Sequence, residues 1–100
     1  MITKEESLAQ LDKFSTYGPD WDYEGAPPIS PTALEMARRI ILDTDTDACW
    51  VVPTHSGGVT LEWQASNPNL YVEAEITPNG DVEVFTMVGH KSFHFVIPKS

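Results

Sequence analysis

Val59-Thr-Leu-Glu-Trp-Gln-Ala65 opens the part of the sequence that decides the fold. Two similar stretches follow it, Leu70-Tyr-Val-Glu-Ala-Glu-Ile-Thr77 and Asp81-Val-Glu-Val-Phe-Thr-Met-Val88. Apolar and polar residues alternate along all of them, which is typical of β-strands with one buried face and one solvated face. The polar positions are repeatedly glutamate, so we expect neighbouring strands whose solvated face is acidic.

Further strands are predicted on both sides of these stretches. Cys49-Trp-Val-Val-Pro53 precedes them, and Ser92-Phe-His-Phe-Val-Ile97 follows them. The connections between the strands are short and contain turn-forming residues. Strands joined by such turns, with no helix between them, form an antiparallel meander. We therefore expect a sheet of four to five strands.

Two helices are predicted before the sheet. Thr3 and Glu6 have the spacing of a capping box, which favours a helix over about residues 4–14. Ser30-Pro31 is typical of a helix start, with Ser as the N-cap and Pro at the first helical position. This second helix should end near Asp43, where an acidic connector begins.

The apolar residues of the strands need cover, so the helices should pack on one face of the sheet. The predicted fold class is α+β, as a single domain over residues 1–100. Two N-terminal helices would pack on one face of a four- to five-stranded antiparallel meander sheet, and the other face would stay open. The strand residues expected under the helices are Leu61, Trp63, Leu70, Val72, Ile76, Val82 and Val84.

Fifteen acidic residues against six basic ones give the chain a net charge of −9. Nucleic acid and anionic membranes need cations to neutralise their phosphates, so direct binding to either is disfavoured. The expected partner is a basic surface of another protein, including one that normally holds nucleic acid. Cys49 is the single cysteine, and the sequence shows neither a signal peptide nor a membrane span, so a cytoplasmic location is expected.

The turn at residues 78–80 predicts which side chains are neighbours on the open face, because turn length sets strand register. If Thr77 pairs with Asp81, then Glu75 lies opposite Glu83. Like charges on directly opposite residues destabilise a sheet by some tenths of a kcal/mol per pair. On a solvated face that binds nothing, lysine alternating with glutamate would give a more stable sheet.

The preceding turn extends this acidic face, since pairing of Ala65 with Leu70 places Glu62 opposite Glu73. Outward-pointing apolar side chains, including Met87, lie among the glutamates, which suits a protein-binding surface. The alternative interpretation is that the charges only protect an exposed sheet from aggregation. The predicted partner-binding residues are Glu62, Tyr71, Glu73, Glu75, Glu83 and Phe85.

The sequence contains no recognisable catalytic, metal-binding or nucleotide-binding motif, so we expect a protein that is not an enzyme and has no cofactor. His55, His90 and His94 with Cys49 match no usual zinc spacing. Cys49 is expected in the core. The alternating aspartates from Asp43 to Asp47 lack the central glycine and distal glutamate of an EF-hand loop, so they predict a solvated connector.

The loop from Asp20 to Ile29 contains a tryptophan, a tyrosine and several acidic residues. We expect Trp21 to close one end of the core. The alternative is an aromatic recognition loop.

Trp21-Asp-Tyr-Glu-Gly-Ala-Pro-Pro-Ile-Ser-Pro31, followed by Gly57-Gly-Val-Thr-Leu-Glu-Trp63, resembles a family of uncharacterised small bacterial and phage proteins. Their pattern is a Trp-Asp-x-x-Gly-Ala-Pro-Pro loop, a Ser-Pro helix start and a Gly-Gly-Val-x-Leu-Glu-Trp strand. The sequence departs from the pattern at Tyr23-Glu24, where the family has Gly-Tyr. The resemblance covers about two-thirds of the chain. It implies a common fold and a bacterial or phage origin, and no activity.

These observations predict an acidic, protein-binding inhibitor encoded by a phage or another mobile element. It would block a basic nucleic-acid-binding surface of a host defence nuclease or CRISPR effector, its carboxylates replacing DNA phosphates. In size, acidity and lack of motifs the chain is similar to anti-CRISPR proteins, by analogy only. One alternative is an antitoxin or immunity-type partner of a toxin. A second alternative, less favoured because an open face offers no cleft, is a small enzyme that uses paired carboxylates.

Overall fold

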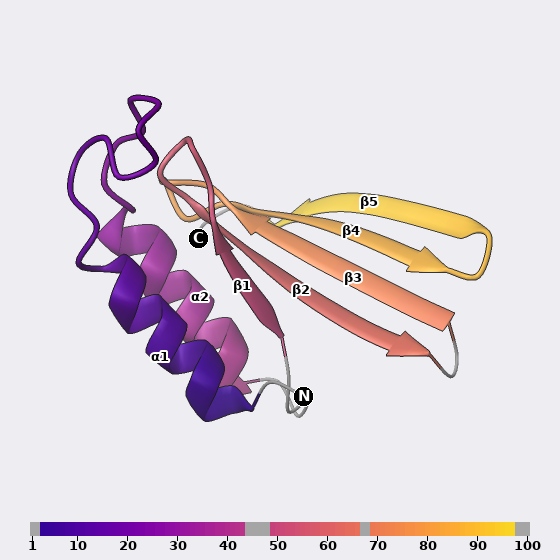
Figure 1. Ribbon diagram of the computed structural model, residues 1–100. Coiled ribbons are helices and arrows are strands. Elements are labelled where there is room, and N and C mark those ends of the chain that lie inside the picture. Colours follow the sequence, from indigo (N-terminus) through magenta and orange to yellow (C-terminus); the bar gives the residue numbers. More distant parts are fainter. Residues whose placement is uncertain (1–2, 44–48, 67–68, 98–100) are drawn as a thin grey trace.

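The computed structural model of the chain describes residues 3–43, 49–66 and 69–97, and its two helices precede its five strands (Figure 1). The expected connector after Asp43 and the middle of the turn after Ser66 lie outside the described residues. No helix in the described part is long and apolar enough to cross a membrane. The elements are α1 (Lys4–Phe14), α2 (Pro31–Asp43), β1 (Trp50–Pro53), β2 (Val59–Ser66), β3 (Asn69–Ile76), β4 (Val82–Val88) and β5 (Lys91–Ile97).

Both helices begin where their capping residues predict. At α1, the Glu6 backbone N–H donates to Thr3 Oγ1 at 3.1 Å, and the Thr3 N–H donates to Glu6 Oε1 at 3.4 Å. At α2, the Ala33 N–H donates to Ser30 Oγ at 3.3 Å. These bonds satisfy backbone donors of the first turns that have no partner inside the helix.

The five strands form one antiparallel sheet in the order β1-β2-β3-β4-β5, so the predicted meander is confirmed (Figure 1). The predicted register is confirmed as well. The Thr77 N–H donates to the Asp81 carbonyl at 2.9 Å, and Gly80 closes the turn at a φ of 93°, which a residue with a side chain rarely adopts. Ala65 lies opposite Leu70 across β2 and β3.

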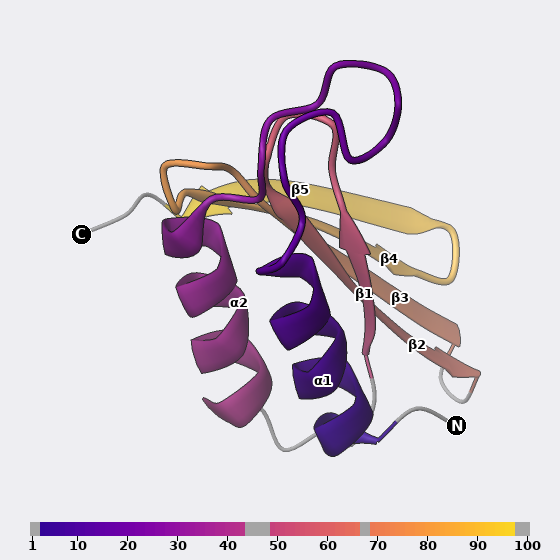
Figure 2. The ribbon, with the colours of Figure 1, turned by 60° about the vertical axis from the view of Figure 1, so that its left-hand side comes forward.

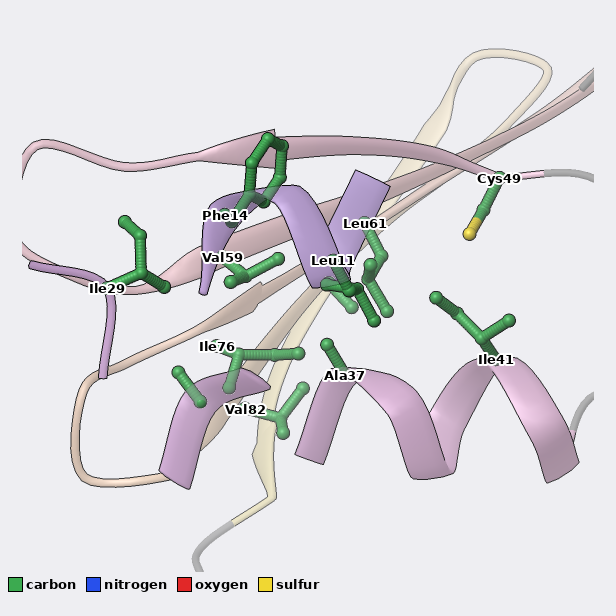
Figure 3. Packing of buried hydrophobic residues seen from close by; sticks show 12 residues of the cluster. Leu11, Phe14, Ile29, Ala37, Ile41, Cys49, Val59, Leu61, Ile76 and Val82 are labelled. Atoms are coloured by element: carbon green, nitrogen blue, oxygen red, sulfur yellow. The ribbon is translucent and has the colours of Figure 1, made fainter. Parts of the chain in front are cut away.

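The core lies between the helices and one face of the sheet. α1 packs against β1, and α2 packs against β2 and β3 (Figure 2). The Ser7 hydroxyl is buried and donates to the Cys49 carbonyl at 2.8 Å, which ties α1 to the start of β1. The core side chains include Leu11, Phe14, Ile41, Val59, Leu61 and Ile76 (Figure 3).

The helices cover the sheet only on its β1–β3 side. The Ser7 hydrogen bond ties α1 to the start of β1, and α1 packs on α2, while β4 and β5 extend beyond the helices (Figure 1). The side chains that the sequence predicted under the helices therefore differ in burial. Leu61, Ile76 and Val82 are buried, whereas Trp63, Leu70, Val72 and Val84 are only half-buried.

Candidate protein-binding face

The face of the sheet opposite the helices carries a row of glutamates on three adjacent strands. Glu62 of β2 lies opposite Glu73 of β3, and Glu75 of β3 lies opposite Glu83 of β4. Directly opposite residues are about 5 Å apart, and residues two apart on one strand are roughly 7 Å apart. The four side chains therefore form a continuous path across the sheet, which we call the carboxylate row.

No cation of residues 3–43, 49–66 and 69–97 pairs with the carboxylate row. Among the described residues, none of the four glutamates forms a salt bridge. Strand alternation puts no lysine or arginine of β1–β5 on this face, since Lys91 lies opposite Val88 on the helix side. The two arginines pair instead with carboxylates of the helices, Arg38 with Asp12 and Arg39 with Glu35.

Aromatic side chains lie beside the carboxylate row. The Tyr71 hydroxyl donates to Glu73 Oε1 at 3.2 Å. Burial, and then this hydrogen bond to a carboxylate, raise the pKa of Tyr71 above its usual 10.0. Phe85 lies opposite Glu73, and its ring stacks on His94 of β5 with ring centres 4.5 Å apart.

A hollow of about 290 Å³ opens between these rings, and its lining includes Tyr71, Phe85, Met87 and His94. The structure thus gathers Tyr71 and Phe85, both predicted for this face, around one concave site next to Glu73. His94 was not among the predicted site residues. Its alternation with Phe93 and Phe95 indicated the face, but stacking on Phe85 follows only from the register of β5.

The loop before α2 packs mainly through its tryptophan. Trp21 Nε1 donates to the Pro27 carbonyl at 2.8 Å, and the indole ring stacks on Tyr17 with ring centres 5.3 Å apart. Trp21 also packs against the core, which agrees with the expected packed loop. Tyr23 in the same loop is 91% exposed and has a φ of 61°, an uncommon conformation for a residue with a side chain.

The same loop is joined to the β1–β2 turn by a pair that the sequence analysis missed. His55 Nδ1 lies 2.6 Å from Asp22 Oδ2. The hydrogen bond to His55 is the largest influence on Asp22 and lowers the pKa of its carboxyl from the usual 3.8 to about 2. The same bond raises the pKa of His55 above its usual 6.5. Thirty-three positions separate the two residues, and no sequence pattern links them.

Asp22, Glu24 and His55 are also the residues of the described part that could hold a metal ion. Each offers one ligand atom, and these atoms all lie within 4.8 Å of one another. Both oxygens of the Asp22 carboxylate already have hydrogen-bond partners. Oδ1 accepts from the N–H groups of Glu24 and Ala26, and Oδ2 is hydrogen-bonded to His55 Nδ1. We therefore interpret the cluster as a clamp between two loops.

Comparison with protein-family models found no match, and comparisons with curated proteins and with solved structures found none either. The resemblance of the Trp21–Pro31 loop to small bacterial and phage proteins therefore stays a prediction.

Proposed function

We propose that the open face binds a basic surface of another protein, and that the chain acts as an inhibitor of a host defence nuclease or CRISPR effector. The carboxylate row carries this proposal, because its four side chains are adjacent and none of them forms a salt bridge within the described part of the chain. In the complex the carboxylates stand where DNA phosphates normally bind. A phage or mobile-element origin belongs to the same proposal and rests on the sequence resemblance alone.

Repulsion within the carboxylate row favours a basic partner. Each directly opposite pair of like charges costs the free chain about 0.2–1 kcal/mol. Lysine or arginine side chains of a partner remove this repulsion and add attraction, so binding is stronger than the contact area alone implies. A charge of −9 also steers a cationic partner toward the chain and raises the association rate at low salt.

The hollow beside Glu73 gives the face a place for one basic side chain of the partner. Tyr71 and Phe85 supply aromatic rings, and Glu73 accepts a hydrogen bond from the Tyr71 hydroxyl and lies opposite Phe85. A guanidinium or ammonium group gains about 0.5–2 kcal/mol over an aromatic face, depending on how far it is desolvated. The side chains that line the hollow are mainly aromatic, with Met87 and two hydroxyl residues beside them, and the lining contains no carboxylate pair, which favours binding over acid–base catalysis.

A capture experiment with a bacterial host lysate tests this function. The immobilised chain is expected to retain a nucleic-acid-binding protein at low salt and to release it in a salt gradient, because exposed charge pairs are screened. A DNA duplex added at low salt is expected to displace the same protein. Release by salt without displacement by DNA would favour the toxin-neutralising alternative instead.

Matched variants locate the contact on the face. Glu73→Lys with Glu75→Lys is expected to abolish capture. Glu5→Lys with Asp43→Lys changes the net charge equally but alters exposed helix positions, so capture should largely persist. Equal loss in both variants would show that only the net charge matters, and an unaffected complex would overturn the proposal.

A further inference from the structure

The helix side of β3–β5 carries apolar side chains that the helices do not cover. Phe93 is 53% exposed, Phe95 50% and Ile97 52%, and all of them lie on the same side of β5 as the core. Every residue of β5 is exposed. We call this surface the apolar shelf, and its residues are Leu70, Val72, Val84, Phe93, Phe95 and Ile97.

The apolar shelf continues into a hollow at the margin of the helices. This hollow has a volume of about 380 Å³ and lies between Ile40 of α2 and strand residues that include Trp63, Val72 and Val84. All of its lining residues are apolar. In Figure 1, β4 and β5 extend away from α1 and α2, and the exposure of Phe93, Phe95 and Ile97 shows that this part of the shelf is open to solvent.

The exposed apolar area is comparable to the largest apolar patch of a typical soluble monomer, and such patches are often functional. A phenylalanine buries about 150–250 Å² in a core, so Phe93 and Phe95 at half exposure leave on the order of 100 Å² each to solvent. With their neighbours they form a contiguous patch of a few hundred Å², the size that marks interaction sites on soluble proteins.

We propose that the apolar shelf is the interface of a two-fold symmetric homodimer, in which the shelf of one copy packs face to face on the shelf of a second copy. Such an interface uses the same surface on both subunits and therefore has to be complementary to itself. An apolar surface with almost no charge meets this condition.

The distribution of charge identifies a second copy as the occupant. Two copies with a net charge of −9 each repel one another across most of their surfaces. Over the strand ranges 69–76, 82–88 and 91–97, the helix side carries no acidic residue and Lys91 is its one charged residue. Face-to-face packing turns both carboxylate rows outward, away from the interface and from each other.

The geometry of packed sheets fits this arrangement. Two sheets that pack face to face lie about 10 Å apart, a gap that interdigitated side chains fill. Phe93, Phe95 and Ile97 of each copy are large enough to fill it. The total area lies near the lower end for specific interfaces, about 1,000 Å², so we expect a reversible dimer with a Kd in the micromolar range.

Sedimentation equilibrium over a range of protein concentrations tests the dimer. The expected result is a reversible monomer–dimer equilibrium whose Kd falls several-fold when salt is raised, because salt screens repulsion between the acidic copies. A basic partner on the carboxylate row shows the opposite salt dependence. The two proposals are therefore separable, and a chain that stays monomeric at high concentration and high salt overturns this one.

Neighbouring residues of β5 provide a matched pair of variants. Phe95→Lys places a charge on the apolar shelf and is expected to weaken the dimer at least 100-fold. Val96→Lys makes the same addition on the opposite face of the strand, where Val96 is 51% exposed, and is expected to leave dimerisation nearly unchanged. A dimer that persists in Phe95→Lys and is lost in Val96→Lys would place the interface on the open face and contradict the proposal.

Methyl NMR of the unaltered chain gives a test that does not depend on how the variants fold. On dilution, the methyl signals of Val72, Val84 and Ile97 should shift over the same concentration range in which sedimentation shows the dimer dissociating. The signals of Val52 and Val96, on the open face, should stay in place. Shifts confined to the open face, or to the free edge of β5, contradict the proposal.

Discussion

Glu75 of β3 lies directly opposite Glu83 of β4, and among the described residues neither carboxylate has a salt-bridge partner. Glu83→Lys converts this like-charge pair into an attractive one. We expect the free energy of unfolding to rise by about 0.2–1 kcal/mol, and the captured partner to bind more weakly. Urea unfolding measures the first effect and the lysate capture the second. Glu83→Gln, which only removes the repulsion, should give a smaller gain, and a net loss of stability in both variants would show that the pair is not repulsive.

The clamp between Asp22 and His55 should depend on pH in two ways. The folded-state pKa of His55 lies above its usual 6.5. Its contribution to the stability of the folded chain is therefore complete below pH 6.5 and is lost as pH rises through the raised pKa. The folded-state pKa of Asp22 is about 2 against the usual 3.8, so its contribution is complete above pH 3.8 and is lost as pH falls through 2. The loops are therefore held most firmly between about pH 4 and 6.5.

An NMR titration of the His55 ring protons measures this dependence. The unaltered chain should show His55 titrating above 6.5, and Asp22→Asn should return it toward that value. His90, in the turn between β4 and β5, serves as the internal reference. An identical His55 titration in both proteins would mean that the pair does not persist in solution.

The β1–β2 turn should not tolerate a side chain at Gly58. A Cβ there would collide with the backbone carbonyl of Ile76 on β3, which cannot move without disturbing the sheet. Gly58→Ala is expected to lower the free energy of unfolding by about 3 kcal/mol, the upper end for overpacking. Gly18→Ala is the control, because nothing lies within 4 Å of its added Cβ and the change should stay within about 0.5 kcal/mol. Equal effects of the two substitutions would contradict the close approach of Gly58 to the Ile76 carbonyl.

Cys49 should react slowly with thiol reagents in the native state. The side chain is buried, and burial raises the pKa of its thiol, so little reactive thiolate is present. Modification by a chromogenic disulfide should be slow in buffer and complete within seconds in denaturant. Rapid modification of the native chain would indicate that the α1–β1 junction opens readily.

The register of the sheet could be predicted from the sequence because it depends on local information. Turn lengths and period-two alternation were enough to place Glu75 opposite Glu83 and Ala65 opposite Leu70. The helix starts were predictable for the same reason, since each capping residue acts within its own first turn.

Other features depend on contacts between distant segments and could not be read from the sequence. The Asp22–His55 pair joins two loops of irregular structure. The partial cover of the sheet follows from where α1 and α2 are tied, and the alternation of Phe93 and Phe95 shows only which side of β5 is apolar. Whether a helix reaches that side is decided by the tertiary packing.

The opposite chemistry of the two sheet faces also constrains how the chain folds. A slip of one residue between neighbouring strands moves every side chain of the slipped strand to the other face. For β3 this would drive Glu73 and Glu75 under the helices, against the positions that Leu11 and Ile41 occupy. An unpaired buried carboxylate costs several kcal/mol, so misaligned sheets are strongly disfavoured. The acidic residues thus help to select the native strand register, independent of any partner that they bind.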